Sequence, residues 1–424
     1  MKIDEVNLKI IKDSRGENTL QATIKVGNFY FSADVPSGES RGSHEAFVLD
    51  PVLALQKFET IKSRVVEREC NDQALFDTFL RELDGTPNKN NLGGNTILAF
   101  SIAWARAKAK LEGLELYEYI GKMFDVRYEP RAARMPHPIF NMIEGGAHVR
   151  HEKNKLDFQE FQVIPYDTEL RRTDTELRGQ FNFTKAFDAG REFYAKLGVT
   201  LEETYGKENV TLGDESGFSA PFQKNEEALD ILDALIKNMN GAFKIGLDIA
   251  ANQLLDADGI YTIGQKKYSA SGLIPYYFNL VHAYPIISLE DPFGEESFND
   301  FSFLRAYFYK LLGTKEFPLV ITDDLTTTNQ TRLGTAIERD AGNAIIIKPN
   351  QIGTVTETIE VARLAERAGW KKIVSHRSRD TTDDFISDLA VGVRAWGIKA
   401  GAPEKPERLA KYKRLIKIAG ELSS

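Results

Sequence analysis

Short apolar runs rich in β-branched residues recur from residue 135 onward, and this repetition constrains the fold more than any other feature. Eight such runs stand in the sequence: HPIFNMI, FQVIP, VTLGD, FKIGLD, IISLED, LVITDD, AIIIKPN and KIVSHRS. Most of the later runs are separated by segments with helical spacing, such as GTVTETIEVARLAERAGW, which predicts a mostly parallel sheet. Eight strands in roughly 250 residues suit a closed β/α barrel. An open doubly wound sheet is the alternative, but no glycine-rich turn after a first strand supports it.

The N-terminal part has a different pattern. Residues 1–50 alternate with a period of two, as in VNLKIIK, and Gly27-Asn28 predicts a hairpin turn. Helical spacing follows, and then a charged stretch that contains Pro130, where we place the domain boundary. The predicted fold class is α/β, with an N-terminal α+β domain before a C-terminal β/α barrel, and the expected bounds are 1–130 and 135–424.

Composition argues against several classes of function. The formal net charge of -8 argues against binding to nucleic acid or to an acidic membrane surface. The single cysteine, Cys70, allows no intrachain disulfide and no thiolate metal cluster. The first residues, MKIDEVNLKI, lack the apolar run of a signal peptide, and no stretch approaches the roughly 20 apolar residues of a membrane span. We therefore expect a cytoplasmic protein without a membrane span.

Polar residues end several of the predicted strands. Asp248, Glu290 and Asp323 end three successive runs, and the carboxyl ends of barrel strands share one mouth. Three converging carboxylates repel one another unless a cation lies between them, and oxygen ligands favour Mg²⁺ before Ca²⁺ or Mn²⁺. The scarcity of cysteine and histidine argues against zinc. The alternative is that each acid is a solvated loop residue or a helix cap.

A lysine also ends one of these runs. Lys348 follows AIII and precedes Pro349, which cannot donate to a central strand and must therefore stop it. A nearby divalent cation would disfavour the ammonium form and lower the pKa of Lys348 toward the range of a base. The alternative is a simple ion pair with Asp323.

Two further segments carry candidate binding groups. His376, Arg377 and Ser378 follow one another, and two donors beside a hydroxyl would form a clamp for phosphate or carboxylate. The alternative is that Arg377 pairs with an acid such as Asp383. His148 follows two glycines in a loop, where a lone histidine is more often structural than catalytic.

Nearly the whole chain resembles one family. The segments DSRGENT, PSGESRGSHEA, LDFQEF, GDESGF, SLEDPF, DDLTTTN, KPNQIGT, SHRS and IKAGAPEKPERLAKY occur in the order found in enolases. The resemblance implies a magnesium-dependent lyase of glycolysis and gluconeogenesis, which interconverts 2-phosphoglycerate with phosphoenolpyruvate and water. It also implies two Mg²⁺ ions per active site, a small anionic phospho-acid as substrate, and a homodimer or higher homo-oligomer.

The resemblance also implies roles for the matching residues. Lys348 would remove the C2 proton, and Glu215, with Glu160 beside it, would protonate the departing C3 hydroxyl. The other roles concern binding. Asp248, Glu290 and Asp323 would bind the first Mg²⁺, and Ser40 would help to bind the second. Arg377 and Ser378 would bind the phosphate, Lys399 would bind the carboxylate, and His148, Gln159 and His376 would complete the pocket.

The chain departs from the family pattern around this core. The replaced positions are Arg41, Ser216, Pro349, Arg379, Thr382 and Ala400, and the loop from 148 to 160 is longer than usual and carries Arg150, His151, Lys153 and Lys155. One alternative is a related enzyme that acts on a more anionic phospho- or phosphono-acid. Another is an inactive binding or scaffold protein, but the lysine base and the metal acids are all retained.

Overall fold

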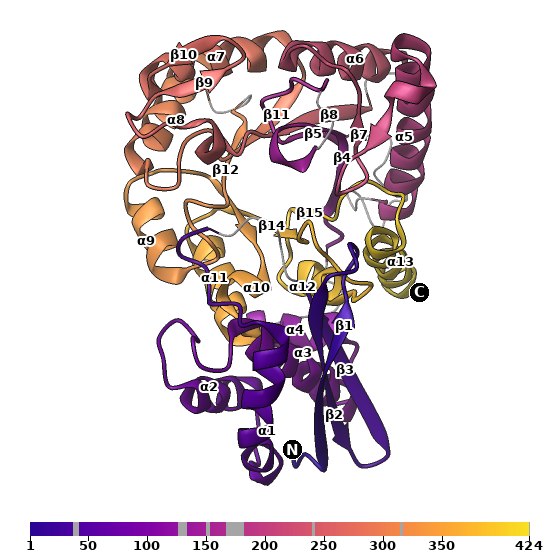
Figure 1. The fold of residues 1–424 in the computed structure, drawn as a ribbon, viewed down its shortest axis with the longest axis vertical. Helices are drawn as coiled ribbons and strands as arrows, with labels where there is room; N and C mark the ends of the chain where they lie inside the picture. Colours follow the sequence, from indigo (N-terminus) through magenta and orange to yellow (C-terminus); the bar gives the residue numbers. More distant parts are fainter. Residues whose placement is uncertain are drawn as a thin grey trace.

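The computed structural model describes residues 1–36, 42–125, 134–149, 153–166, 182–239, 242–313 and 317–423. Its N-terminal part is an antiparallel sheet of three strands, packed against helices, and it lies at one side of a larger barrel (Figure 1). The strands are β1 Glu5–Lys12, β2 Asn18–Val26 and β3 Phe29–Val35; the helices are α1 Pro51–Glu67, α2 Gln73–Asp84, α3 Gly94–Leu111 and α4 Leu116–Phe124. The expected hairpin turn at Gly27 and Asn28 is present, because Val26 pairs with Phe29.

The C-terminal part is a closed barrel of eight strands, in which β15 pairs with β4 to complete the ring. These strands are β4 His137–Glu144, β5 Glu160–Pro165, β8 Phe243–Asp248, β11 Ile286–Glu290, β12 Leu319–Thr322, β13 Ala344–Ile347, β14 Lys371–Ser375 and β15 Gly397–Lys399. The structure and the predicted fold class therefore agree: an N-terminal α+β unit precedes a β/α barrel.

Helices surround the barrel (Figure 1). They are α5 Phe183–Tyr205, α6 Asn225–Asn238, α7 Ala270–Ala283, α8 Phe298–Leu312, α9 Gln330–Glu338, α10 Pro349–Ile352, α11 Val355–Arg367, α12 Phe385–Gly392 and α13 Pro406–Glu421. Smaller elements lie in the connections: the hairpins β6 Thr211–Leu212 with β7 Phe218–Ser219 and β9 Tyr261–Ile263 with β10 Lys266–Tyr268, and the 3₁₀ helices η2 Gly146–His148, η4 Lys207–Asn209 and η5 Ala251–Leu254. Pro349 occupies the first turn of α10, a position that proline favours, so β13 ends directly before Lys348 as predicted.

One barrel strand runs against the others. β5 is antiparallel to both of its neighbours, β4 and β8, whereas the other pairs in the ring are parallel. The first residue of β5, Glu160, therefore lies at the same end of the barrel as the last residues of its neighbours. It pairs with Glu144 on one side and with Asp248 on the other. Strand direction thus brings Glu160 to the mouth.

The predicted set of eight strands was wrong at one position. The run VTLGD contributes only the two-residue β6, which joins the sheet through β7 and lies outside the closed ring. The eighth ring strand is β15, with the sequence GIK. Three residues are too few to show a period of two, so this strand leaves no hydrophobic pattern that could be recognised in the sequence.

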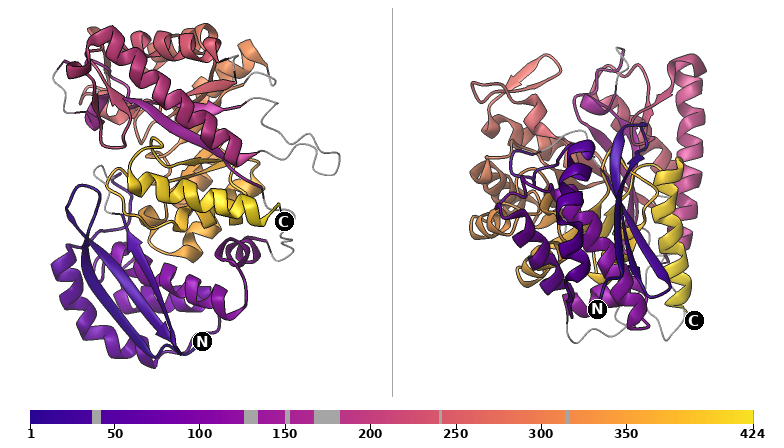
Figure 2. Two further views of the ribbon diagram at one scale, coloured as in Figure 1. Left: turned by 90° about the vertical axis from the view of Figure 1, so that its right-hand side faces the viewer. Right: turned by 60° about the horizontal axis from the view of Figure 1, so that its bottom comes forward.

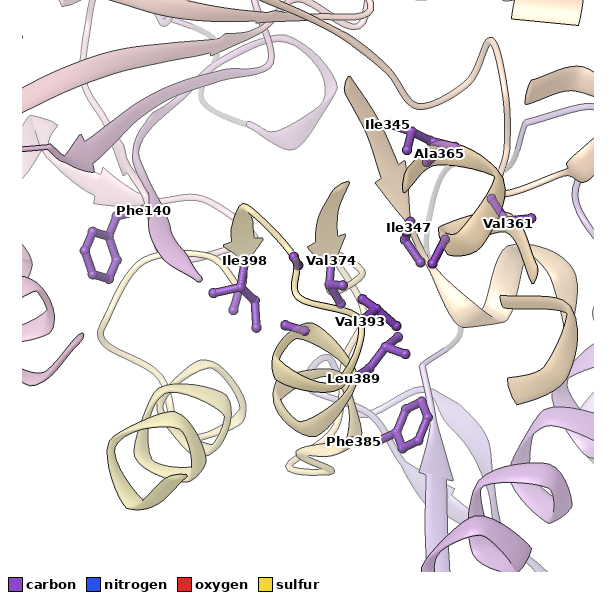
Figure 3. Close-up of a cluster of buried hydrophobic side chains, with 14 of the residues drawn as sticks. Phe140, Ile345, Ile347, Val361, Ala365, Val374, Phe385, Leu389, Val393 and Ile398 are labelled. Atoms are coloured by element: carbon purple, nitrogen blue, oxygen red, sulfur yellow. The ribbon is translucent and has the colours of Figure 1, made fainter. Parts of the chain in front are cut away.

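The two faces of each barrel strand have different partners. Ile345 and Ile347 of β13 point toward Val361 and Ala365 of α11 (Figure 3), whereas the alternate residues of β13 face the barrel interior. The interior cluster consists of Ile139, Ile164, Ile321, Ala344, Ile346 and Ile373. Because successive side chains alternate between faces, the residue two positions beyond Ile346, which is Lys348, continues the inward series at the mouth.

The N-terminal part packs against the barrel helices α10, α11 and α12 through α2, α3 and α4 (Figure 1, Figure 2). Polar contacts also cross this boundary. Arg106 of α3 forms a two-pronged ion pair with Asp383, with N to O distances of 2.7 and 2.8 Å. Within the described ranges, no helix is both long and apolar enough to cross a membrane.

Candidate active site

One cavity at the mouth of the barrel gathers most of the predicted site residues. Its lining includes His148, Gln159, Glu160, Glu215, Asp248, Asp323, Lys348, His376, Arg377, Ser378 and Lys399. Glu290 lies directly beside it, because its carboxylate accepts hydrogen bonds from Lys399. Ser40 and Arg41 lie outside the described residues, as do Arg150 and His151. The remaining candidates come from strand ends and from the loops that follow them, and the closed ring brings them together.

Lys399 lies among three carboxylates. Its Nζ is 2.7 Å from Asp248 Oδ2, 3.0 Å from Glu290 Oε1 and 3.2 Å from Glu160 Oε2. All four side chains are buried. Burial alone would lower the pKa of Lys399, but the three acids raise it well above its ordinary value. Lys399 is therefore a fixed positive charge at the mouth.

Lys348 lies beside Asp323. The two side chains form an ion pair, and Asp323 Oδ1 also accepts a hydrogen bond from Gln351 at 2.9 Å. Burial would lower the pKa of Lys348, but the Asp323 carboxylate raises it above its usual value. The ion pair considered as an alternative is therefore present in the structure. A cation held by Asp323 would weaken this ion pair and lower the pKa of Lys348 toward the range of a base.

Glu215 is held from several directions. Its Oε2 accepts hydrogen bonds from His376 Nε2 at 3.0 Å and from Asn141 Nδ2 at 3.3 Å. Arg408 contacts the other ring nitrogen of His376, so Nε2 carries the hydrogen that is donated to Glu215. This places His376 at the Glu215 end of the site.

A second glutamate lies close to Glu215. One oxygen of Glu160, one of Glu215 and a ring nitrogen of His148 lie within 4.8 Å of one another. Burial raises the pKa of Glu160 to about 8. For Glu215, burial acts in the same direction, but hydrogen bonding and charge from His376 hold its pKa well below its usual range. The pKa values of these two neighbouring carboxyl groups are thus shifted in opposite directions.

The loop after β14 is tied to the N-terminal part of the chain. Arg377 Nη1 lies 2.8 Å from Glu45 Oε2 and 3.5 Å from Asn350 Oδ1, so the acid beside Arg377 is Glu45, whereas Asp383 pairs with Arg106. Arg408 donates to the carbonyl oxygens of Arg377 at 2.8 Å and Ser378 at 2.7 Å. Arg379 is half-buried in the same loop.

The donors at the mouth fit a hard divalent cation. Asp291, Asp323 and Asp324 each offer an oxygen, and these three oxygens lie within 4.8 Å of one another. Burial, together with the charge of Asp248, raises the pKa of Glu290 well above its usual range, which indicates negative charge that a cation would stabilise. Carboxylate oxygens are the ligands that Mg²⁺, Mn²⁺ and Ca²⁺ prefer.

Sequence reasoning missed several residues of this site. Glu144 ends β4 and is fully buried beside Glu215; it could have been found by the rule that polar residues end the strand runs. Asp291 and Asp324 directly follow two of the predicted metal acids. Glu45 and Arg408 lie within the quoted segments PSGESRGSHEA and IKAGAPEKPERLAKY, but neither was assigned a role from the sequence.

The fold and the site together define a class: a β/α-barrel enzyme whose mouth combines buried carboxylates with two lysines. Comparison with known proteins identifies the family within that class. Residues 3–120 match the family model described as "Enolase, N-terminal domain", and residues 132–424 match "Enolase, C-terminal TIM barrel domain". The chain therefore belongs to the enolase family, and it is a carbon–oxygen lyase.

Individual relatives agree over nearly their whole length. The enolase of Methanocaldococcus jannaschii is 38% identical, with 99% of this chain and 96% of the relative aligned. The enolase of Methanopyrus kandleri is 39% identical, with 100% and 96% aligned. Enolase B of Dictyostelium discoideum is 38% identical, with 100% and 95% aligned.

Proposed function

We propose that this protein interconverts 2-phosphoglycerate with phosphoenolpyruvate and water, through proton removal at C2 followed by loss of the C3 hydroxyl. The observation that carries the proposal is that Lys348 and the pair of Glu160 and Glu215 line one cavity. The same cavity is lined by carboxylates that suit a divalent cation. The reaction needs a base for C2 and an acid for C3, and it also needs positive charge for the dianionic enediolate formed between the two steps.

Lys348 is the proposed base. It follows β13 on the inward-facing register and reaches the cavity from the strand end. In this structure the Lys348 ammonium forms an ion pair with Asp323. If the Asp323 carboxylate bound a metal ion instead, the ammonium would lose its counter-charge and could more readily lose a proton. A lysine or histidine base assisted by one or two Mg²⁺ ions is already known for the enolase superfamily as a whole, and the assignment to Lys348 follows that pattern.

Glu160 and Glu215 are the proposed acid pair. Dehydration needs one proton on the C3 oxygen as the C3–O bond breaks and the C2–C3 double bond forms, so that hydroxyl leaves as water. Glu160 has the raised pKa and Glu215 is ionised beside it. We assign delivery of this proton to the pair, with His376 orienting the Glu215 carboxylate.

The remaining side chains are assigned to binding. Asp248, Glu290 and Asp323 would hold one Mg²⁺ and Ser40 would help to hold a second. These ions would supply positive charge to the substrate carboxylate. Lys399 would support the same carboxylate from the protein side. Arg377 and Ser378 would bind the phosphate, and His148 and Gln159, whose Oε1 accepts from Gln253 Nε2 at 2.9 Å, would complete the pocket.

The test is an absorbance assay for phosphoenolpyruvate formed from 2-phosphoglycerate with Mg²⁺. We expect robust turnover by the wild-type protein and a loss of about 10²- to 10⁴-fold in Lys348→Ala, the usual contribution of a general base. Negligible dehydration by folded, Mg²⁺-saturated wild-type protein would refute the proposal. In that case a more anionic phospho- or phosphono-acid would be the substrate class to test next.

We further propose a domain boundary between residues 130 and 135, a homodimeric or higher assembly, and a cytoplasmic location. Support for the boundary comes from the two family models, which match residues 3–120 and 132–424. Arg15, in the segment DSRGENT, forms an ion pair with Asp214 of the same chain. The assembly is therefore best tested directly, by light scattering of the purified protein across a range of concentrations.

A further inference from the structure

A third glutamate, Glu144, lies behind the proposed acid pair. It is the last residue of β4 and its side chain is fully buried. Whereas Glu160, Glu215 and His148 line the cavity at the mouth, Glu144 sits beneath them, with its Oε2 at 3.9 Å from His148 Nδ1. It therefore cannot act on substrate by direct contact.

The carboxyl group of Glu144 lies inside the turn that carries Glu215. Its Oε1 accepts a hydrogen bond from the backbone N–H of Gly217 at 2.6 Å and from that of Glu215 at 3.1 Å. Both donors are buried, and leaving a buried N–H without an acceptor is unfavourable.

The turn is shaped around this carboxyl group. It is closed by the Gly213 N–H, which donates to Gly217 O at 2.8 Å. A Cβ atom added at Gly217 would lie 2.9 Å from Glu144 Oε1, and one added at Gly213 would also collide with the Glu144 side chain. Ser216, between them, adopts a left-handed backbone with φ of 74°, which disfavours residues other than glycine. The conformation of the turn thus depends on the acceptor at its centre.

We propose that Glu144 is a positioning residue: its carboxyl oxygen fixes the backbone of the turn and thereby aims the Glu215 side chain at the C3 oxygen of the substrate. The inference rests on the proposed function. The proposal concerns the position of the acceptor. An oxygen atom must lie at the Oε1 position to accept from the backbone N–H groups of Glu215 and Gly217, whereas a negative charge there is not required. His376 and Asn141 fix the tip of Glu215, and Glu144 fixes the backbone beneath it.

Burial and the neighbouring Glu215 carboxylate raise the pKa of Glu144 well above its usual range, so the position of the acceptor, not a charge, is the property to test. Glu144→Gln keeps an oxygen within reach of the Oε1 position and removes the ionisable group. Glu144→Asp keeps a carboxyl group but withdraws the acceptor by one methylene, away from Gly217 N. For each variant we would measure the dehydration kcat and KM with 2-phosphoglycerate and Mg²⁺, and the exchange of the C2 proton in D₂O. Exchange reports the Lys348 half of the reaction and serves as the internal control.

We expect Glu144→Gln to dehydrate within about threefold of the wild-type rate. Glu144→Asp should lose about 10- to 100-fold in kcat, the scale of a misplaced catalytic group, while KM and C2 exchange change by less than about threefold. Adding Glu144→Asp to Glu215→Gln should cause no further loss, because the positioned group is already disabled.

Three results would overturn the inference: a Glu144→Asp variant more active than Glu144→Gln, equal losses of exchange and dehydration, or multiplied losses in the double variant. Failure of the proposed function would look different, because the wild-type protein itself would then not dehydrate 2-phosphoglycerate. Circular dichroism of each variant confirms that the fold is retained before rates are compared.

Discussion

The ion pair between Arg106 and Asp383 should link the stability of the N-terminal part to the loop that carries Arg377. Arg106 lies on α3, and its guanidinium donates to both oxygens of Asp383, at 2.7 and 2.8 Å. It also donates to the carbonyl oxygen of Ser32. The side chains of Arg106 and Asp383 are only 20% and 10% exposed. Arg106→Met keeps a flexible apolar stem and removes the charge and all of these donors.

The expected cost follows from what remains after the substitution. The Asp383 carboxylate would stay buried with the backbone N–H groups of Asp34 and Phe385 at 3.0 and 2.9 Å, but without a counter-charge. Removing one partner of a buried pair typically costs about 3–5 kcal/mol. We expect about 3 kcal/mol here, because two hydrogen bonds persist. Arg106→Met with Asp383→Leu should be less destabilised than Arg106→Met alone.

Urea denaturation of the wild-type protein, both single variants and the double variant would measure this coupling as a double-mutant cycle. Burial would raise the pKa of Asp383, but Arg106 holds it below its ordinary value of 3.8. The coupling should thus be fully present above about pH 4 and should weaken as pH falls through the lowered pKa. A cost below about 1 kcal/mol for Arg106→Met at pH 7, or strictly additive single costs, would refute the reasoning.

Four further predictions concern the site and a buried carboxyl group on α2. Lys348→Ala should abolish C2 proton exchange in D₂O, whereas Glu215→Gln should retain more exchange than dehydration; equal loss of both activities in both variants would contradict the assigned roles. Excess chelator should abolish turnover and added Mg²⁺ should restore it, and undiminished activity in chelator would exclude the proposed metal site. Arg379→Gly should change kcat/KM for 2-phosphoglycerate by about 1 kcal/mol or less, the scale of an exposed ion pair; a loss of about 1.5–3 kcal/mol would indicate contact with a more anionic substrate. Burial raises the pKa of Asp77 from 3.8 to about 6, so stability should fall by about 3 kcal/mol as pH rises through that window, and urea titrations should show a flatter profile for Asp77→Asn.

The strand ends could be located from the sequence with little ambiguity. Asp248 and Glu290 end β8 and β11, and Lys348 follows β13, as the apolar runs predicted. These positions are local: a buried strand must be apolar for a few residues, and the first polar residue marks where it leaves the core. The helices between the runs were recognised for the same reason, through their spacing of apolar residues.

The direction of a strand could not be read in this way. β5 is antiparallel, and only this reversal places Glu160 beside Asp248 at the mouth. An apolar run looks the same whichever way the strand runs, so its hydrophobic pattern carries no information about direction. The short strand that ends at Lys399 was also invisible, because its stability comes from pairing with β14 and β4.

The sequence by itself determined the alternation of strands and helices and the chemical groups at the strand ends, because burial and periodicity act within a few residues of the chain. Only the tertiary structure decided the partners of those groups. Glu45 is paired with Arg377, and Glu144 lies under the turn of Glu215. Such pairs join segments dozens to hundreds of residues apart, and their geometry depends on how the barrel closes and where the N-terminal part packs. The sequence therefore specifies the chemical groups of each pair, but only the closed fold brings the two groups together.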